Sequence, residues 1–394
     1  MKLFKDIGAS ASLAILFLLS VEGLLRLSGT RFEGSFYQPD RELGYALRPN
    51  AHGWNVVENL NYFRVNADGM ADRDRSLQRA PNVMRIAVVG DSVSEAKQVQ
   101  RDQTYWAVMQ RAMNLRLAPT GRQVEVLNFG VAGYSLAQEL LVIRSSRLWK
   151  YDPQIVLLSG TIESFVLRST RTLSPNTAAE RVPFYVRRNG TLEPDAQTLR
   201  ERASFRNSTA LNRFGDIMNM SRLLALCNEG IKRSREEIDA SLGRHPHANA
   251  YKESDSFLGP ATPDLKSAWD ISEAFIVSAN EEVRRHHAEF WLFTLDMPQQ
   301  VDPDPAVRAE FERSLGITDL FLSDRLFAGF AAREGIPHGT LAPALQAFAE
   351  KNKIALHGFS GTARNSGHWN VAGHRAAGEL LAEQLLGFSA NAGR

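Results

Sequence analysis

Short apolar runs alternate with amphipathic stretches over much of the chain. The runs MRIAVVG (84–90), VEVLNFG (124–130), DPQIVLLSG (152–160) and EFWLFTL (289–295) have the apolar character of buried parallel strands. Helical spacing of apolar residues marks the stretches around them, at 103–117, 135–149, 267–286, 305–314, 320–333 and 371–386. Strands that alternate with helices in this way predict a doubly wound α/β fold with a parallel sheet.

The N-terminal stretch differs from the rest of the chain. Residues 8–21 carry no charge, and Lys2 and Lys5 precede them. A basic start followed by an apolar run is typical of an export signal. Counted through Leu27, the stretch is long enough to span a membrane, and no clear A-x-A cleavage site follows it. We therefore expect an uncleaved signal anchor over 1–27, with the bulk of the chain outside the cytoplasm, in the periplasm; a cleaved signal peptide is the alternative.

The remainder of the chain falls into three parts. Residues 28–80 predict a membrane-proximal segment with strand-like pieces, the clearest of them at 54–66. The α/β pattern predicts one domain over 81–387. This domain is interrupted at about 166–262 by a stretch rich in Arg, Ser, Asn and Pro, with a helical pattern at 216–238. We interpret the interruption as an insertion or lid.

Overall charge and cysteine content exclude several classes of function. The 46 basic and 44 acidic residues give a net charge of +2, which offers no electrostatic reason to expect a nucleic-acid partner. The single cysteine, Cys227, excludes an intramolecular disulfide and a zinc site built on several thiolates. We expect no metal site and no cofactor.

Three polar loops have the composition of sites that carry chemistry. The first is GDSVSE (90–95), directly after the first predicted strand. Ligands of such sheets bind at the carboxyl ends of the strands, where the hydroxyl and the N–H of Ser92 would both face the crevice. The alternative is that Asp91 and Ser92 only cap a helix.

The other two loops follow the second strand and precede the last helix. NFGVAGYS (128–135) contains Gly130 and Gly133, whose N–H groups could face a developing negative charge or could simply belong to a tight connection. NSGHWNVAGH (365–374) contains His368 in a polar loop. Its imidazole is a reasonable general base for a serine nucleophile, whereas a satisfied surface histidine is the alternative. Each signal is weak alone.

Together, in this order, the GDS, G-x-x-G and GHWNVAGH motifs resemble the SGNH (GDSL) hydrolase superfamily. More narrowly, the chain resembles its bacterial membrane-anchored members, including those associated with O-acetylation of exported polysaccharides. The resemblance implies a flavodoxin-like sheet, with Ser92 as nucleophile and His368 as the base. It also implies an oxyanion hole made by the N–H groups of Ser92 and of Gly130 or Gly133. The implied substrate is an ester, such as an acetyl group on a carbohydrate.

Two positions depart from the family pattern. The loop GTIESF (160–165) has Ile162 where the family has an Asn that donates to the oxyanion, and Glu163 follows it. Losing one such donor typically costs about 10²–10³ in rate. Asn365 lies where the family usually has the Asp that orients the histidine, so we expect Asn365 to orient His368. In serine proteases the corresponding Asp-to-Asn change costs about 10⁴.

The sequence therefore leaves three functions open. The first is an SGNH-type serine esterase or O-acyltransferase, supported by Ser92, His368 and the glycine loop. The second is a catalytically impaired binding or scaffold protein of a polysaccharide export system, supported by Ile162 and Asn365. The third, a lipid or thioester hydrolase, would share the site and differ only in its pocket.

Overall fold

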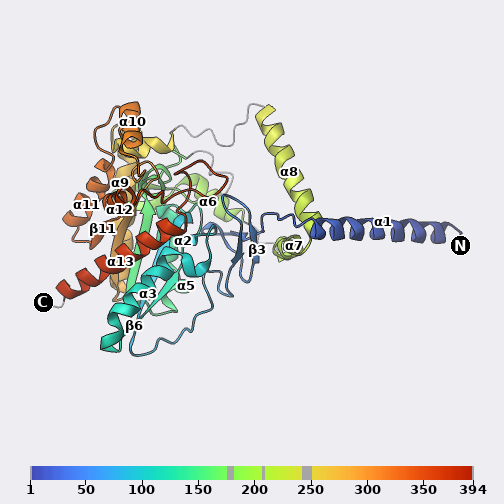
Figure 1. Cartoon of the computed structure of the whole chain (residues 1–394), viewed down its shortest axis with the longest axis horizontal. Helices are drawn as coiled ribbons and strands as arrows, with labels where there is room; N and C mark the ends of the chain where they lie inside the picture. The colour runs from blue at the N-terminus through green and yellow to red at the C-terminus, as the bar shows by residue number, and fades with distance from the viewer. Residues whose placement is uncertain (1, 175–181, 206–208, 242–250, 393–394) are drawn as a thin grey trace.

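A five-stranded parallel sheet forms the centre of the molecule (Figure 1). The structure is a computed structural model that describes residues 2–174, 182–205, 209–241 and 251–392. The strands lie in the order β11-β10-β7-β5-β6, which counted along the chain from the other edge is 2-1-3-4-5. This is the flavodoxin-like order, and it confirms the predicted fold class. The strands are β5 (Val83–Gly90), β6 (Gln123–Asn128), β7 (Ile155–Thr161), β10 (Glu289–Leu295) and β11 (His338–Thr340).

The central strands are buried on both faces because successive side chains point to opposite sides of the sheet. On β5, Ile86 and Val88 belong to one apolar core, whereas Ala87 and Val89 belong to the other. This placement accounts for the unbroken apolar run in the sequence. The edge strand β11 was not predicted, because its three residues contain no apolar run.

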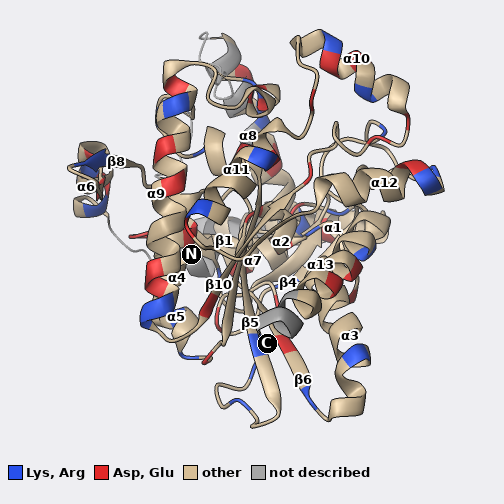
Figure 2. Cartoon of the chain, turned by 90° about the vertical axis from the view of Figure 1, so that its left-hand side faces the viewer, with Lys and Arg blue, Asp and Glu red and all other residues tan. Residues whose placement is uncertain are grey.

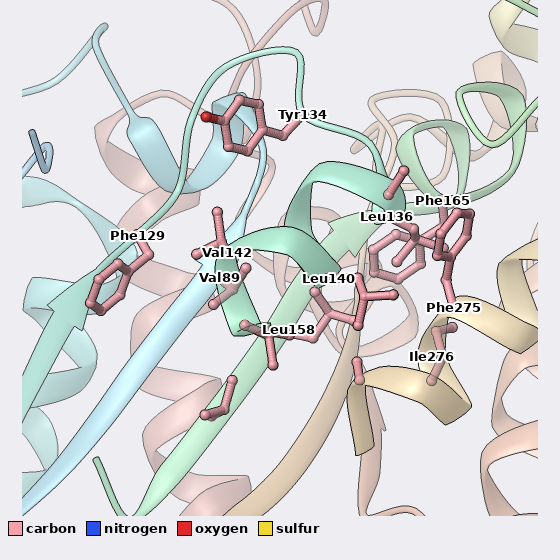
Figure 3. Close-up of a cluster of buried hydrophobic side chains, with 14 of the residues drawn as sticks. Val89, Phe129, Tyr134, Leu136, Leu140, Val142, Leu158, Phe165, Phe275 and Ile276 are labelled. Atoms are coloured by element: carbon pink, nitrogen blue, oxygen red, sulfur yellow. The ribbon is translucent and has the colours of Figure 1, made fainter. Parts of the chain in front are cut away.

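Helices cover both faces of the sheet. One core lies beneath α3 (Tyr105–Leu117), α12 (Ala342–Asn352) and α13 (Val371–Ala392). The other lies beneath α4 (Leu136–Arg144), α9 (Pro263–Arg285) and α11 (Leu322–Arg333), and Figure 3 shows side chains of α4 and α9 against the strands. Charged residues lie on the outer sides of the helices (Figure 2). The other helical elements of the domain are α2 (Ser92–Glu95), η1 (Arg101–Gln103), η2 (Ala118–Thr120), α5 (Ser146–Trp149), η3 (Glu163–Leu167) and α10 (Pro305–Leu315).

The segment before the sheet folds as two antiparallel hairpins. One consists of β1 (Tyr37–Asp40) and β2 (Gly44–Leu47), and the other of β3 (His52–Asn55) and β4 (Asn61–Arg64). Their apolar residues Phe36, Leu47, Phe63 and Val65 are buried in the same core as α4 and α9. The segment predicted as membrane-proximal thus packs directly on the α/β domain.

The inserted region contains a small hairpin and several helices. Its elements are β8 (Tyr185–Arg188), β9 (Thr191–Pro194), α6 (Ala196–Ala203), α7 (Thr209–Met220), α8 (Arg222–Ser241) and η5 (Glu253–Leu258). The prediction of a single helix over 216–238 is wrong, because α7 ends at Met220 and α8 begins at Arg222, with Ser221 between them. The hydroxyl of Ser221 accepts a hydrogen bond from the Leu224 N–H and so caps the start of α8.

The apolar N-terminal stretch forms one long helix, α1 (Lys2–Leu27), which projects from the body as a rod (Figure 1). Its window Ser10–Leu27 is long and apolar enough to cross a membrane and is not buried within the protein. Glu22 accepts hydrogen bonds from the backbone N–H groups of Arg222 and Leu223, so the end of α1 is tied to the start of α8.

Candidate active site

The candidate site lies at the carboxyl ends of β5 and β7, where the strand order reverses. Chain connections leave β5 toward β6 on one side and return to β7 on the other, which opens a crevice at this edge of the sheet. Gly90 ends β5 and leaves no room for a side chain, since a Cβ there would lie 2.4 Å from the Ser159 carbonyl oxygen. Asp91 then caps α2 by accepting a hydrogen bond of 3.0 Å from the Val93 N–H. The cap therefore places Ser92 at the first position of the helix.

Ser92 and His368 meet at this edge although 276 positions separate them in the chain. The distance between Ser92 Oγ and His368 Nε2 is 2.8 Å, a hydrogen bond in which the hydroxyl donates and the imidazole accepts. His368 lies in the loop between α12 and α13, which an isolated bridge between His357 and Trp369 holds in place. Both side chains line the same cavity. This is the geometry of a serine next to its general base.

A carboxylate that the sequence analysis missed completes this arrangement. Both carboxyl oxygens of Glu58 lie 2.9 Å from His368 Nδ1, and the backbone N–H of His368 donates to Glu58 at 3.3 Å. Because Nε2 accepts from Ser92, Nδ1 carries the proton and donates it to Glu58. The chain of hydrogen bonds therefore runs from a hydroxyl through an imidazole to a carboxylate.

Glu58 reaches the histidine from the turn of the β3–β4 hairpin. Its φ of 63° lies in the left-handed region, which is uncommon for a residue other than glycine. Burial raises the pKa of the Glu58 carboxyl, but hydrogen bonds to His368 and the charge of that ring outweigh it and lower the pKa overall. Glu58 is therefore ionised at neutral pH and is placed to stabilise an imidazolium.

The expectation that Asn365 orients His368 is wrong. Its side-chain amide donates to the Pro298 carbonyl at 2.7 Å and to the Asp302 carboxylate at 3.1 Å. With φ at 51°, Asn365 occupies a left-handed turn and joins its loop to the 298–302 loop. Asn365 therefore stabilises the contact between two loops, and the carboxylate next to His368 comes from elsewhere in the chain.

The glycine loop also differs from expectation. The Gly130 N–H donates to the side chain of Asn128 at 2.9 Å, so it is not available to an oxyanion and its predicted role is wrong. A Cβ at Gly130 would lie 2.3 Å from Ser94 Cβ, which explains why glycine stands there. Gly133, with φ at 79°, lies near the guanidinium of Arg168, and neither its N–H nor that of Ser92 donates a hydrogen bond within the described residues.

The loop after β7 has the two residues that the sequence marked as departures. Ile162 is 2% exposed and packs into the core, so it does not reach the cavity. Glu163 does line the cavity, but Arg168 pairs with it through two hydrogen bonds of 3.1 and 3.3 Å. The guanidinium therefore offsets the negative charge that Glu163 would otherwise bring near the serine.

A second, buried histidine supports the loop of the first. His357 Nδ1 lies 2.8 Å from the Gly367 carbonyl oxygen, and its Nε2 lies 2.8 Å from a carboxyl oxygen of Asp296. The other oxygen of Asp296 accepts from the Trp369 indole N–H at 2.9 Å. Residues on both sides of His368 are thereby fixed by one buried pair.

The cavity beside Ser92 and His368 has a volume of about 380 Å³. It extends from the end of β5 to the inserted region, where Tyr251 and the first residue of η5, Glu253, contribute to its wall. This volume is within the range that holds a small ligand.

Comparison with known proteins gives structural neighbours only. No family model and no curated protein matches the chain. The chain is similar to the solved structure of TesA, at 15% identity and a TM-score of 0.34, over 77% of this chain and 98% of the other. It is similar to the acetyl xylan esterase AlAXEase at 13% identity and a TM-score of 0.36, over 77% and 98%. A lipolytic protein of the G-D-S-L family from Veillonella parvula has 11% identity and a TM-score of 0.35, over 77% and 96%.

Proposed function

We propose that the protein is an SGNH-type serine esterase or O-acyltransferase. The observation that carries this proposal is the continuous hydrogen-bonded chain from Ser92 through His368 to Glu58. In the proposed roles Ser92 is the nucleophile, His368 the general base and Glu58 the carboxylate that orients the ring and stabilises its charged form.

The proposed reaction begins when Ser92 Oγ attacks the ester carbonyl carbon while His368 Nε2 takes the hydroxyl proton. The tetrahedral intermediate collapses, the bond to the leaving oxygen breaks, and that oxygen receives the proton from Nε2. Water or a sugar hydroxyl then gives a proton to Nε2 and attacks the acyl carbon of the acyl-enzyme. The bond from that carbon to Ser92 Oγ breaks, and Nε2 returns the proton to Oγ. The N–H groups of Ser92 and Gly133 are the donors proposed for the oxyanion.

We further propose that α1 anchors the chain in a membrane with the α/β domain outside the cytoplasm. The apolar window Ser10–Leu27 and the lysines before it support this arrangement. The sequence resemblance to membrane-anchored SGNH proteins supports an acetyl ester on a carbohydrate as substrate.

The second candidate is a binding or scaffold protein of a polysaccharide export system with impaired catalysis. The position of Ile162 supports it, because no Asn amide takes part in the oxyanion hole at that place. The argument that once came from Asn365 no longer applies, since Glu58 supplies a carboxylate. The two candidates differ in whether Ser92 reacts.

A serine-directed aryl phosphonate tests the proposal. The full-length protein in detergent or vesicles should be labelled at one serine, and Ser92→Ala should abolish the labelling. Ser174→Ala is the matched control, because Ser174 lines the same cavity. Labelling that persists in Ser92→Ala, or its absence from the wild type, would favour the binding protein.

A further inference from the structure

Within the described residues, the cavity beside Ser92 is lined by more acidic than basic side chains. Among the described residues, its titratable lining consists of four carboxyl groups, one guanidinium, two imidazoles and one phenol: Asp91, Glu163, Glu253, Asp296, Arg168, His357, His368 and Tyr251. Low-dielectric walls around a cleft focus such a field on whatever enters. The charge of this cavity therefore bears on which esters reach the serine.

The guanidinium in the cavity is not available to bind an anion. Arg168 forms a two-point pair with Glu163 through Nε and Nη2. The charge of Glu163 raises the pKa of Arg168, and the nearby Asp91 raises it further. Recognition of a carboxylate or phosphate normally uses such a two-point fork for the ligand, and here a residue of the protein already occupies it.

Both histidines of the described lining are already bound to groups of the protein. The imidazole of His357 is held between the Gly367 carbonyl and Asp296. The imidazole of His368 is held between Ser92 and Glu58. Each ring thus faces a carboxylate of the protein.

Glu253 is the carboxylate in the cavity without a partner. Within the described residues its side chain makes no hydrogen bond or ion pair, and it lies in the first turn of η5. That segment is fixed to α11, because Ser323 Oγ donates to the Ser256 carbonyl at 2.6 Å. Glu253 is an exposed residue of the cavity wall. Partial burial of its carboxyl group and then the charge of Glu163 raise its pKa, whereas Arg168 and the two cavity histidines lower it. The charges of Glu253 and of the other titratable groups in the cavity wall therefore affect one another.

We propose that this cavity selects esters of uncharged or amino sugars and rejects esters of sugars that carry a carboxylate, sulfate or phosphate. The inference rests on the proposed function, since it concerns the substrate of the same serine. Among the described residues, an anionic group in the cavity meets the unpaired Glu253 and finds no unpaired guanidinium. A neutral group is not repelled, and a cationic group is attracted by Glu253 while the Arg168 guanidinium is already paired with Glu163.

A series of aryl acetates that differ only in charge tests this inference. The para substituent is a carboxylate, a carboxamide or a trimethylammoniomethyl group, and each enzymatic kcat/KM is divided by the hydroxide-catalysed rate of the same ester. At about pH 8 and low salt, where the carboxylate of the anionic ester is ionised, the order should be cationic, then neutral, then anionic, with the anionic ester at least about tenfold slower than the neutral one. Salt should reduce the difference.

The variant Glu253→Gln measures the contribution of the unpaired carboxylate. Removing the charge of Glu253 should raise the ratio of kcat/KM for the anionic ester to that for the neutral ester about fivefold. Glu253→Lys should raise this ratio further. The matched control is Asp255→Asn, since Asp255 lies in the same turn but does not line the cavity. The ratio for this control should equal that of the wild type.

The outcomes separate this inference from the proposed function. A serine-dependent reaction with equal rates for the three esters, or a ratio that Glu253→Gln shifts no more than Asp255→Asn, would overturn the charge selection alone. If no ester is hydrolysed, the labelling rates of phosphonates with the same three substituents give the ratio. If Ser92 reacts with none of them, the proposed function fails and the inference fails with it.

Discussion

Replacing Glu58 with glutamine is the most direct test of the site, because it removes a charge and keeps the shape of the side chain. In the structure the carboxylate lies 2.9 Å from His368 Nδ1. When His368 takes the serine proton, the ring becomes positive next to this carboxylate. Two unit charges about 4 Å apart interact by about 4 kcal/mol at an effective dielectric constant of about 20. Losing that interaction should lower kcat by about 10³, since about 1.4 kcal/mol corresponds to a factor of ten.

The assay is steady-state hydrolysis of a neutral aryl acetate by the full-length protein. We expect Glu58→Gln to lower kcat with little change in KM, because the carboxylate stabilises charge that develops during the reaction. Circular dichroism and thermal unfolding should show an intact fold. A folded Glu58→Gln variant that retains a tenth or more of the wild-type kcat would refute the role given to Glu58.

Asn365→Asp provides the comparison for this experiment. If Asn365 oriented the histidine, a carboxylate at that position would raise activity. In the structure the amide instead faces the Asp302 carboxylate at 3.1 Å, so the new charge would meet a like charge. We expect no increase in kcat and a loss of thermal stability. A clear gain in kcat would show that the side chain at 365 acts on the histidine.

Three further predictions concern buried titratable groups. Burial lowers the pKa of His374 to about 3, so between about pH 6.5 and 3 only the unfolded chain binds a proton at this histidine. The free energy of unfolding of the wild type, measured in urea, should therefore decrease as pH falls through this range. In His374→Asn this decrease should be smaller, by up to about 1.4 kcal/mol per pH unit. Burial raises the pKa of Glu139 well above its usual value, so the stability that it contributes is lost as pH rises above about 5. Glu139→Gln should therefore gain stability over the wild type as pH rises toward neutrality in the same titration. His357→Asn should lower kcat, because the variant loses the hydrogen bond from the imidazole to the Gly367 carbonyl next to His368. The phosphonate should still label Ser92. An unchanged kcat would contradict the idea that His357 helps to position His368.

The sequence predicted the parts of the fold that depend on local pattern. The strands that became β5, β6, β7 and β10 are continuous apolar runs, because each is buried on both faces. The edge strand β11 was not predicted, because it has only three residues and these are only partly buried. A single helix was predicted at 216–238, because the spacing of apolar residues does not reveal that Ser221 caps the start of a second helix there.

The site was predicted only in part, for a different physical reason. Ser92 and His368 occur in local motifs, so spacing within each motif pointed to them. Glu58 has no local signal, because it acts from a hairpin turn 310 positions away from the histidine. Gly130 was assigned to the oxyanion hole because glycine suggests backbone access to a ligand, whereas here it only makes room for Ser94.

The position of Glu58 also changes how the anchor-proximal segment is understood. A boundary at residue 81 treats 28–80 as a connection between a membrane helix and an enzyme. Yet the β3–β4 hairpin carries the carboxylate at its turn and buries Phe63 in the core of the α/β domain. The same hairpin is joined to the residues that follow α1, since Glu33 accepts from the Val56 N–H and pairs with Lys97. A fragment that begins at 81 would keep Ser92 and His368 but lose Glu58, the carboxylate on the other side of the imidazole from the serine. The segment 28–80 therefore contributes a residue to the proposed catalytic centre.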